Sequence, residues 1–495
     1  MMYQSTRDPA HKKYSAAEVI KMGLAPDGGL FIPETIPALS TKEIEALCKE
    51  SYPVRAAKIL GKFLTDYTYE ELLSDCEAAY AETSFPGGAA PLVHVHDNIY
   101  SLELWHGPTA AFKDMALQIM PRLLSRALVK TGETRDALIL VATSGDTGKA
   151  ALEGYKDIDR IKIMVFYPVD GVSRVQKLQM ATQTGSNVNV CAIRGNFDDA
   201  QTGVKKIFGD QEMAAKLNER GYVLSSANSI NWGRLAPQIV YYVSAYCDLL
   251  NKSVIQMGET MDVCVPTGNF GNIFAGYIAK LMGLPIRHFI CASNQNNILT
   301  DFLRTGTYDR NRSFHLTMSP SMDILISSNL ERLLCLSAGE ERTADYMESL
   351  KNNGVYTVEA DVLAKITENF SGYFADEQET AKTIKTYFEN YNYLADTHTA
   401  VALSCAEQYV ATLEAEAIRP IVVDSTASPY KFAADVYESL GKTQPADPLA
   451  ALDELCEATN TEIPYPLRGL GERTVRFTEV IDAEDMPAAV LNYCN

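Results

Sequence analysis

Several features that would narrow the function are absent from the sequence. Ten cysteines are scattered along 495 residues, and no two of them have CxxC spacing. No apolar run approaches the roughly 20 residues of a membrane-spanning helix, and the opening MMYQSTRDPAHKKYSAAEV lacks the apolar core of a secretory signal. We therefore expect a cytoplasmic protein with buried, reduced thiols, no metal site and no membrane association.

Basic residues are in deficit. The chain has 44 Lys and Arg against 63 Asp and Glu, which gives a formal net charge of −19. Nucleic acids and anionic membranes both require a basic surface, so neither is an expected partner. A small anionic substrate is compatible with this charge, because one local group of Arg and Lys can bind a phosphate on an acidic protein.

A succession of strands, glycine-rich turns and helices is present instead. Ala137–Thr143 (ALILVAT) is typical of a buried strand, SGDTG follows it, and a helix is expected from Lys149. The layout recurs with Asp262–Pro266, TGNFGN and Ile273–Met282. Further strands are expected at Ile161–Tyr167, Val188–Ile193, Ile286–Cys291 and Ile421–Asp424, and further helices at Asp114–Val129, with a break at Pro121, and Asp199–Leu217. This alternation predicts an α/β architecture with parallel sheets.

The length favours two or three domains. Residues 1–95 are polar, rich in Pro and Gly around Ala25–Pro37, and then amphipathic, so we interpret them as a separate N-terminal domain. The tail after about Asp447 is again polar and Pro-rich, and no chemistry is visible in it.

The two glycine-rich turns predict anion sites. Backbone N–H groups and the helix dipole favour phosphate after such turns, and glycine allows the backbone to approach closely. The first turn is not a Walker A loop, because Thr143 and Ala150 stand where that motif needs Gly and Ser or Thr. One such turn alone is more often an ordinary strand–helix connection, but two turns rich in Ser, Thr and Asn favour a phosphate-bearing ligand.

Lys113 is the third notable feature. It lies in His106–Asp114 (HGPTAAFKD), just inside an expected helix start, where the dipole disfavours its charge. A lysine with a depressed pKa suits Schiff-base chemistry with an aldehyde cofactor. A single lysine is more often a solvated surface residue.

These segments together resemble the threonine synthase family, and the resemblance spans roughly residues 3 to 440. The similar segments follow the family's order and spacing. They are LAPDGGLFIPETIPAL (Leu24–Leu39), HGPTAAFKD, TSGDTG, SANSINWGR (Ser226–Arg234), PTGNFGN (Pro266–Asn272), SPSMDI (Ser319–Ile324), SNLERLL (Ser328–Leu334), DTHTAV (Asp396–Val401) and TASPYKF (Thr426–Phe432).

The resemblance implies a fold-type II pyridoxal-phosphate (PLP) enzyme, a lyase of three domains. The N-terminal domain would be residues 1–95, the large PLP-binding domain residues 96–135 and 228–495, and the small mobile α/β domain residues 136–227. The implied reaction converts O-phospho-L-homoserine and water into L-threonine and phosphate, the last step of threonine biosynthesis. The expected partner is this small substrate, with the chain a monomer or small homo-oligomer.

The resemblance also implies site residues. Lys113 would bind the cofactor covalently and act as the catalytic base, and Thr426 would face the pyridine nitrogen. Asp146 matches the position near the cofactor's 3′-oxygen, where a carboxylate must share a proton to sit beside a phenolate. The remaining expected residues are Gly268, Asn269, Phe270, Gly271 and Asn272 around the cofactor phosphate, and Ser144, Thr147, Asn228, Ser229 and Arg234 around the substrate.

Two alternatives stay open. Another fold-type II enzyme, such as a serine/threonine dehydratase or a β-replacement enzyme, would share the cofactor but not HGPTAAFKD or the Arg234 segment. A non-catalytic relative kept for binding would not need Lys113 and both turns. Ser229 could equally be a simple helix N-cap, and His398 has no role that the sequence assigns.

Overall fold

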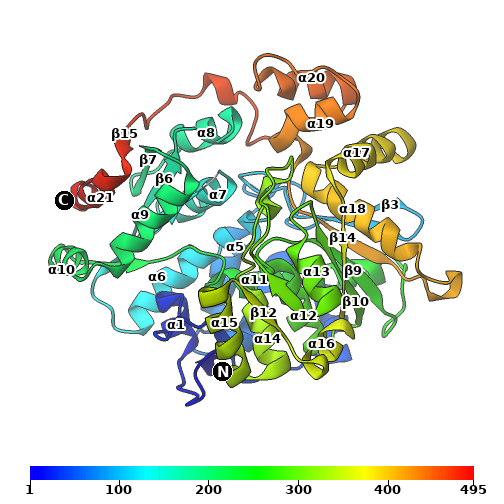
Figure 1. Cartoon of the computed structure of the whole chain (residues 1–495), viewed down its shortest axis with the longest axis horizontal. Helices are drawn as coiled ribbons and strands as arrows, with labels where there is room; N and C mark the ends of the chain where they lie inside the picture. Colours follow the sequence, from blue (N-terminus) through cyan, green and yellow to red (C-terminus); the bar gives the residue numbers. More distant parts are fainter. Residues whose placement is uncertain (144, 171) are drawn as a thin grey trace.

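The computed structural model describes residues 1–143, 145–170 and 172–495. Two mainly parallel sheets, each flanked by helices, lie side by side and form the two main bodies of the molecule (Figure 1). The expected α/β architecture is confirmed.

The larger sheet has the strand order β13-β10-β9-β14-β4-β3 in the described residues, and only the β3–β4 pair is antiparallel. Its strands are β3 (Leu92–His96), β4 (Ile99–Glu103), β9 (Met261–Pro266), β10 (Ile286–Ser293), β13 (Phe370–Phe374) and β14 (Ile421–Ser425). Alternate residues of β9 enter different cores. Val263 and Val265 pack with α11 (Trp232–Asn251) and α12 (Gly271–Leu281), whereas Cys264 packs with α18 (Thr397–Val410). Helices thus cover both faces, as a parallel sheet requires.

Four strands of the smaller sheet, β5 to β8, lie between β4 and β9 in the sequence, and its fifth described strand, β15, comes near the end of the chain. All its neighbouring strands are parallel, in the order β15-β7-β6-β5-β8. The strands are β5 (Asp136–Ala142), β6 (Ile161–Pro168), β7 (Val188–Arg194), β8 (Tyr222–Ser225) and β15 (Val480–Asp482). Its helices are α7 (Asp146–Tyr155), α8 (Arg174–Ala181), α9 (Phe197–Gly209) and α10 (Gln211–Glu219).

The end of the chain corrects the expected domain boundary. The family resemblance predicts that residues 228–495 belong to the large domain, yet β15 pairs with β7 and α21 (Met486–Tyr493) packs on α9 and α10. Before them the chain leaves α19 (Ala433–Ser439) and α20 (Ala450–Thr459) and runs along α8, where the backbone N–H of Arg476 donates to Ala181 O at 2.8 Å. The last residues therefore belong to the smaller sheet (Figure 1).

The N-terminal region consists of a short β-ribbon and four helices. These elements are β1 (Tyr3–Ser5), β2 (Phe31–Pro33), α1 (Ala16–Met22), α2 (Thr41–Leu47), α3 (Tyr52–Phe63) and α4 (Tyr69–Ala79). Ser15 with Glu18, Ser40 with Glu43, and Thr68 with Glu71 form capping boxes that satisfy the first N–H groups of α1, α2 and α4. The bundle packs against α11 and α6 (Met120–Lys130).

Helix boundaries follow local chemistry. The helix expected over Asp114–Val129 is broken before Pro121, as predicted, into α5 (Asp114–Leu117) and α6. The helix expected over Asp199–Leu217 is instead two helices, because the Asp210 side chain accepts from Glu212 and Met213 N–H and starts α10.

The other helices and strands of the described residues are α13 (Ile298–Thr305), β11 (Thr307–Asp309), α14 (Leu330–Ala338), α15 (Glu340–Asn353), β12 (Val355–Thr357), α16 (Ala360–Thr367) and α17 (Glu377–Tyr391). Short 3-10 turns occur at η1 (Pro320–Met322), η2 (Ala415–Ala417), η3 (Pro429–Phe432), η4 (Leu470–Glu472) and η5 (Ala483–Asp485).

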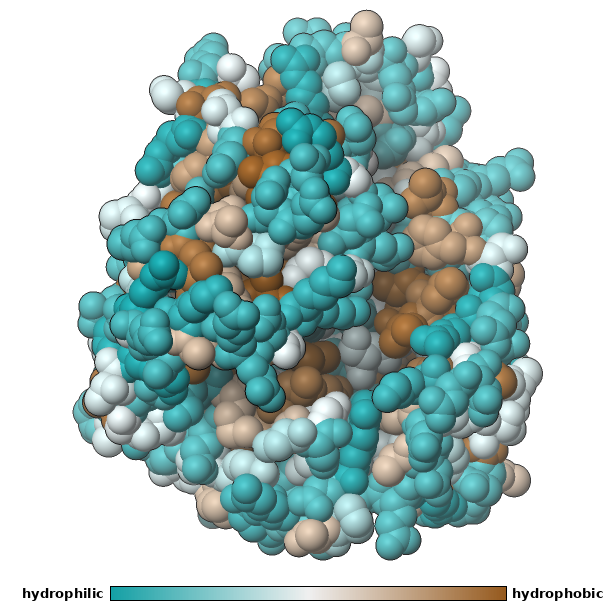
Figure 2. Space-filling model, turned by 60° about the vertical axis from the view of Figure 1, so that its left-hand side comes forward, coloured by the Kyte–Doolittle hydropathy of each residue, from teal (hydrophilic) through white to brown (hydrophobic). Residues whose placement is uncertain are grey.

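Hydrophilic residues cover most of the face drawn in Figure 2, and apolar residues gather in hollows near its middle. Among the described residues, no helix has both the length and the apolarity needed to cross a membrane.

Candidate active site

The loop between β9 and α12 presents free backbone donors. The N–H groups of Gly268, Asn269, Phe270 and Gly271 donate to no other described residue. The carbonyl groups are held away from them, because Ser327 Oγ donates to Gly268 O at 2.6 Å and Asn329 N donates to Asn269 O at 3.0 Å. Free N–H groups at the start of an eleven-residue helix form an anion site.

Close packing around this loop explains its glycines. A Cβ on Gly268 would lie 2.7 Å from the backbone oxygen of Ser321, and one on Gly271 would lie 3.2 Å from Asn329 Nδ2. Phe270 adopts a left-handed conformation with φ of 57°, which is costly for a bulky residue and turns the chain into α12. The loop is thus held in one shape by its neighbours.

The side chain of Asn272 forms hydrogen bonds inside the protein, next to this loop. Its Oδ1 accepts from the hydroxyls of Tyr241 and Tyr242, and its Nδ2 donates to Asp424 Oδ2 at 2.9 Å. Burial raises the pKa of Asp424 to about 7, although hydrogen bonds from Tyr242 and Asn272 oppose the rise. The Asn272 side chain is therefore occupied inside the protein, and the expected contribution to phosphate binding would have to come from its backbone.

Lys113 lies at the start of α5, beside the segment that carries Thr426. Phe112 N donates to Thr426 O at 2.8 Å, and Ala111 and Ala427 form an antiparallel bridge. The Lys113 Nζ and the Thr426 hydroxyl make no hydrogen bond to another described residue. Both polar groups are left open to a ligand.

The Lys113 amine has a depressed pKa. Its side chain keeps some accessible surface, but the surrounding protein desolvates the amine and lowers its pKa to about 8. Asp146 opposes this effect, and the Lys431 and Arg234 cations add to it. The direction agrees with the sequence prediction. Its main cause is burial rather than the dipole of a helix, since α5 has only four residues.

The turn after β5 is built differently. Thr143 Oγ1 accepts from Gly145 N and Gly148 N, both at 2.9 Å, so two of its N–H groups already have a partner. The turn also carries its own anion, the buried carboxylate of Asp146. Thr147 is partly exposed and makes no side-chain hydrogen bond to a described residue, and Ser144 lies outside the described residues.

Arg234 is a buried cation without a carboxylate partner among the described residues. It is 4% exposed, its Nη1 donates to Ala227 O at 2.6 Å, and its Nε lacks a hydrogen-bond partner. Burial lowers the pKa of its guanidinium to about 10. A buried, incompletely paired guanidinium is unfavourable unless an anion binds it.

The other two expected substrate residues lie just before α11. Asn228 is exposed, and its Oδ1 accepts from Ile230 N and the Ser229 hydroxyl. Ser229 is not the N-cap of α11, because Asn231 fills that position and accepts from Gly233 N at 2.9 Å.

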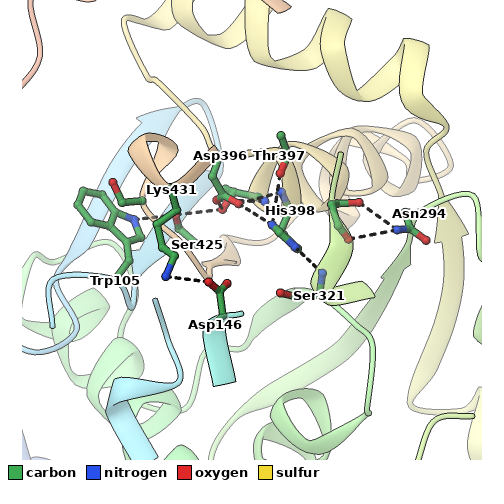
Figure 3. Close-up of polar contacts among 12 residues, drawn as sticks. Trp105, Asp146, Asn294, Ser321, Asp396, Thr397, His398, Ser425 and Lys431 are labelled. Carbon is green, nitrogen blue, oxygen red and sulfur yellow. Dashed lines mark hydrogen bonds and ion pairs between the residues drawn. The ribbon is translucent and has the colours of Figure 1, made fainter. Parts of the chain in front are cut away.

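Two residues near the site were not predicted. Lys431 is buried and lies 2.7 Å from Asp146 Oδ1. His398, which had no assigned role, accepts from Ser321 N at 3.1 Å and lies 3.0 Å from Asp396 Oδ1 (Figure 3). It thereby supports the Ser321 segment that packs against Gly268. Both residues lie in segments that resemble the family, but Asp146 is distant from Lys431 in the sequence, and Ser321 is distant from His398.

Comparison with known proteins identifies the family. Three family models match: "Threonine synthase N terminus" over residues 2–80, "Pyridoxal-phosphate dependent enzyme" over residues 84–423, and "Threonine synthase, C-terminal" over residues 399–490. Threonine synthase of Pseudomonas aeruginosa is 38% identical over 87% of this chain and 89% of its own length. The chain belongs to the threonine synthase family of PLP-dependent enzymes.

A solved relative agrees with this assignment. PLP-bound threonine synthase from Brucella melitensis superposes with a TM-score of 0.89 at 36% identity, covering 100% of both chains. Human threonine synthase-like 1 is 41% identical over 86% of this chain, and the chain spans only 58% of that relative's length.

The described residues fit PLP, the cofactor of this family. A phosphate can be received by the free N–H groups of Gly268–Gly271, an aldehyde by the unbonded Lys113 amine, and a pyridine nitrogen by the Thr426 hydroxyl. Asp146 Oδ2 also accepts no hydrogen bond from a described residue, whereas Oδ1 accepts from Lys431 and Gln176.

Proposed function

We propose that this chain is a threonine synthase that converts O-phospho-L-homoserine and water into L-threonine and phosphate. The observation that carries the proposal is the coexistence of two unsatisfied anion-binding features. These are the free N–H groups of Gly268–Gly271 and the buried Arg234, whose Nε is unpaired and which has no carboxylate partner among the described residues. A cofactor phosphate accounts for the first feature, and a phosphorylated substrate accounts for the second.

Bound PLP would supply an electron sink that acidifies the hydrogens of the substrate's Cα. Lys113 would carry the cofactor, and its amine, once released by the substrate, would accept the Cα proton and, after giving that proton up, a Cβ proton. Protons returned to Cγ and Cα would complete threonine. A pKa of about 8 makes the neutral, basic form of this amine more abundant near neutral pH than in an ordinary lysine. The Thr426 hydroxyl, which is neutral, would hydrogen-bond the pyridine nitrogen without protonating it.

Arg234 would bind the substrate's γ-phosphate and stabilise the charge that develops as phosphate leaves. Its Nε is free, and a guanidinium pairs with phosphate in a bidentate manner. Asn228, Ser229, Ser144 and Thr147 are the further expected substrate residues, and their contacts with substrate remain a prediction.

The reaction also needs controlled access of water, because one water must add at Cβ while others are excluded. Residues 136–227 would close over the substrate as the small domain. A cytoplasmic location is part of the proposal and is supported by the dispersed, mainly buried cysteines.

The decisive experiment compares substrates and maps the cofactor. Purified protein with PLP is assayed for phosphate release from O-phosphohomoserine and for ammonia release from serine. Borohydride reduction and peptide mapping then locate the bound cofactor, with Lys113→Ala as the test variant and Lys62→Ala, at an N-terminal lysine paired with Glu43, as the control. We expect phosphate release, label on the Lys113 peptide, and loss of both only in Lys113→Ala. Ammonia release from serine without phosphate release would favour a dehydratase, and label on another lysine would contradict the assignment of Lys113.

A further inference from the structure

Lys431 joins four segments of the proposed site. Its Nζ lies 2.7 Å from Asp146 Oδ1 and donates to Thr109 O at 3.1 Å and to Gln179 Oε1 at 3.4 Å. The lysine comes from η3 at the end of the large sheet, and its partners come from α7, α8 and the loop before Lys113. Figure 3 shows the amine pointing at the Asp146 carboxylate. A lysine buried this fully is rare unless it is paired.

The two oxygens of Asp146 have different surroundings. Oδ1 accepts from both Lys431 and Gln176 Nε2, the latter at 2.9 Å, whereas Oδ2 accepts nothing from a described residue. The Lys113 amine is close enough to interact electrostatically with this carboxylate. The arrangement fixes the carboxylate through one oxygen and leaves the other for a ligand bound at Lys113.

A lone carboxylate would be a poor neighbour for the cofactor's ring oxygen. That oxygen is a phenol with acidic character, and two adjacent anions repel each other unless they share a proton or a cation. The Lys431–Asp146 pair has no net charge, so it can stand beside an anionic oxygen where Asp146 alone could not. The pair also spans the two sheets, because Asp146 begins α7 and Lys431 lies in η3.

We propose that Lys431 is a positioning residue that holds Asp146 as a neutralised ion pair beside the cofactor's ring oxygen, with Oδ2 directed to the ligand. The proposal rests on the proposed function, since it places PLP at Lys113. In this proposal Lys431 is the cation that neutralises the Asp146 carboxylate, a partner that could not be identified from the sequence.

Charges from several packed elements act on this region, and Glu153 on α7 also acts on Asp114. Besides Asp146 and Lys431 they are Lys113, Asp114 beside it, and Arg234 on α11. Burial would raise the pKa of Asp146, but the Lys431 and Lys113 cations, together with the Gln176 hydrogen bond, hold it below its ordinary value. Burial raises the pKa of Asp114 to about 6, with hydrogen bonds from Thr109 and the charge of Lys431 opposing the rise.

The test is a double-substitution cycle with two readouts. Wild type, Lys431→Met, Asp146→Asn and the double variant are compared by thermal unfolding without cofactor and by the pH midpoint of the bound cofactor's absorption band. Removing a nearby cation raises the pKa of a protonated nitrogen, so Lys431→Met should shift the midpoint upward by about one pH unit. Asp146→Asn should shift it downward, and the double variant should lie closer to wild type than the sum of the single shifts predicts.

A second ion pair on the same helix provides the control. Lys149 is also buried and lies 3.0 Å from Glu153 Oε2, and neither side chain hydrogen-bonds Asp146. The cycle Lys149→Met and Glu153→Gln should show coupling in thermal unfolding but no shift of the absorption midpoint. Lys431→Arg, which retains the cation, should stay within about half a pH unit of wild type.

The outcomes separate this inference from the proposed function. Additive shifts in the Lys431 and Asp146 cycle, or an unmoved midpoint in Lys431→Met, would overturn the role of Lys431. If Lys431→Met does not fold, recovery of folding in the double variant supports the pair, and failure to recover opposes it. Absence of any cofactor band on Lys113 in the wild-type protein would instead overturn the proposed function, and the thermal cycle would still measure the pair.

Discussion

The two strand–turn–helix connections look alike in sequence but differ in what they offer a ligand. The turn before α12 leaves the N–H groups of Gly268–Gly271 without a described partner. In the turn before α7, Thr143 caps two N–H groups, and Asp146 adds a negative charge. The first turn is ready to receive an anion, whereas the second already contains one.

The difference indicates that the two sheets have different roles in binding the cofactor and the substrate. The large sheet would hold the cofactor phosphate with backbone groups that cannot titrate. The smaller sheet would place side chains, Asp146 among them, that respond to charge and to domain movement. Any phosphate on the substrate then needs a separate cation, and Arg234 is a buried cation whose Nε is free and which has no carboxylate partner among the described residues.

The largest effect is expected from removing that cation. Arg234→Ala should weaken kcat/KM for O-phosphohomoserine by about 2–5 kcal/mol, because a desolvated charge pair is broken. The value of kcat should fall as well, since phosphate is the leaving group. Arg234→Lys should recover only part of the loss, because an ammonium lacks the planar fork. Steady-state kinetics measures both, and an Arg234→Ala enzyme with unchanged kcat/KM would remove this residue from the site.

Adding one methyl group to each turn, by replacing a glycine with alanine, should distinguish the role of the turn before α12 from that of the turn before α7. Gly268→Ala places a Cβ against the Ser321 backbone at 2.7 Å, and we expect it to weaken PLP binding by about 1–3 kcal/mol. A Cβ in Gly145→Ala would lie 2.4 Å from Gln176 Cδ, a side-chain atom rather than backbone, and the φ of 142° at this position disfavours alanine. This substitution should reduce thermal stability more than PLP affinity. Equal losses of PLP affinity, measured by fluorescence titration, would contradict the distinction between the turns.

The depressed pKa of Lys113 predicts a pH-dependent stability of the cofactor-free protein. An amine with a pKa of about 8 in the folded state, against an ordinary value of 10.5, is deprotonated by folding. Between these pH values the unfolded chain binds more protons, so stability should rise with pH, and the cost should be fully present below pH 8.

Lys113→Met should therefore stabilise the cofactor-free protein at pH 7 by at most about 3 kcal/mol, and this gain should shrink as pH rises. Denaturant unfolding of both proteins at several pH values measures the difference. Lys382→Met, at an exposed lysine whose side chain is 71% accessible, corrects for the loss of one lysine. A gain that does not depend on pH would show that burial of the charge is not its cause.

Much of the fold was predictable because its signals are local. The strands β5 and β9 are apolar runs, and the sequence placed both within one residue of their observed ends. The start of α7 was expected at Lys149 but lies at Asp146, because Gly145 adopts a backbone conformation that lets the helix begin at once. Features that depend on distant partners were not predictable, such as the three-residue β15, which joins β7 across the molecule.

The site shows the same limit. Lys113 and the two turns were found because each lies at a strand or helix end with a recognisable motif. Lys431 and His398 were present in quoted segments, but their roles depend on partners such as Asp146 and Ser321, which only the folded chain brings near.

The smallest effect is expected at Ser327, whose hydroxyl can be compared with that of Thr143 at the other turn. Ser327 Oγ donates to Gly268 O and holds that carbonyl away from the anion site, whereas Thr143 Oγ1 accepts from the N–H groups of Gly145 and Gly148. Ser327→Ala should cost about 1 kcal/mol of PLP affinity, since one fixing hydrogen bond is lost and the free N–H groups remain.

Thr143→Val should instead cost about 1–3 kcal/mol of stability, because two buried N–H groups lose their acceptor, and Thr143→Ser should restore most of it. Thermal unfolding and PLP titration on the same four proteins measure both quantities. If Thr143→Val lowered PLP affinity as much as Ser327→Ala does, the second turn would be part of the phosphate site. If Ser327→Ala lowered only stability, the orientation of the Gly268 carbonyl would not control phosphate binding.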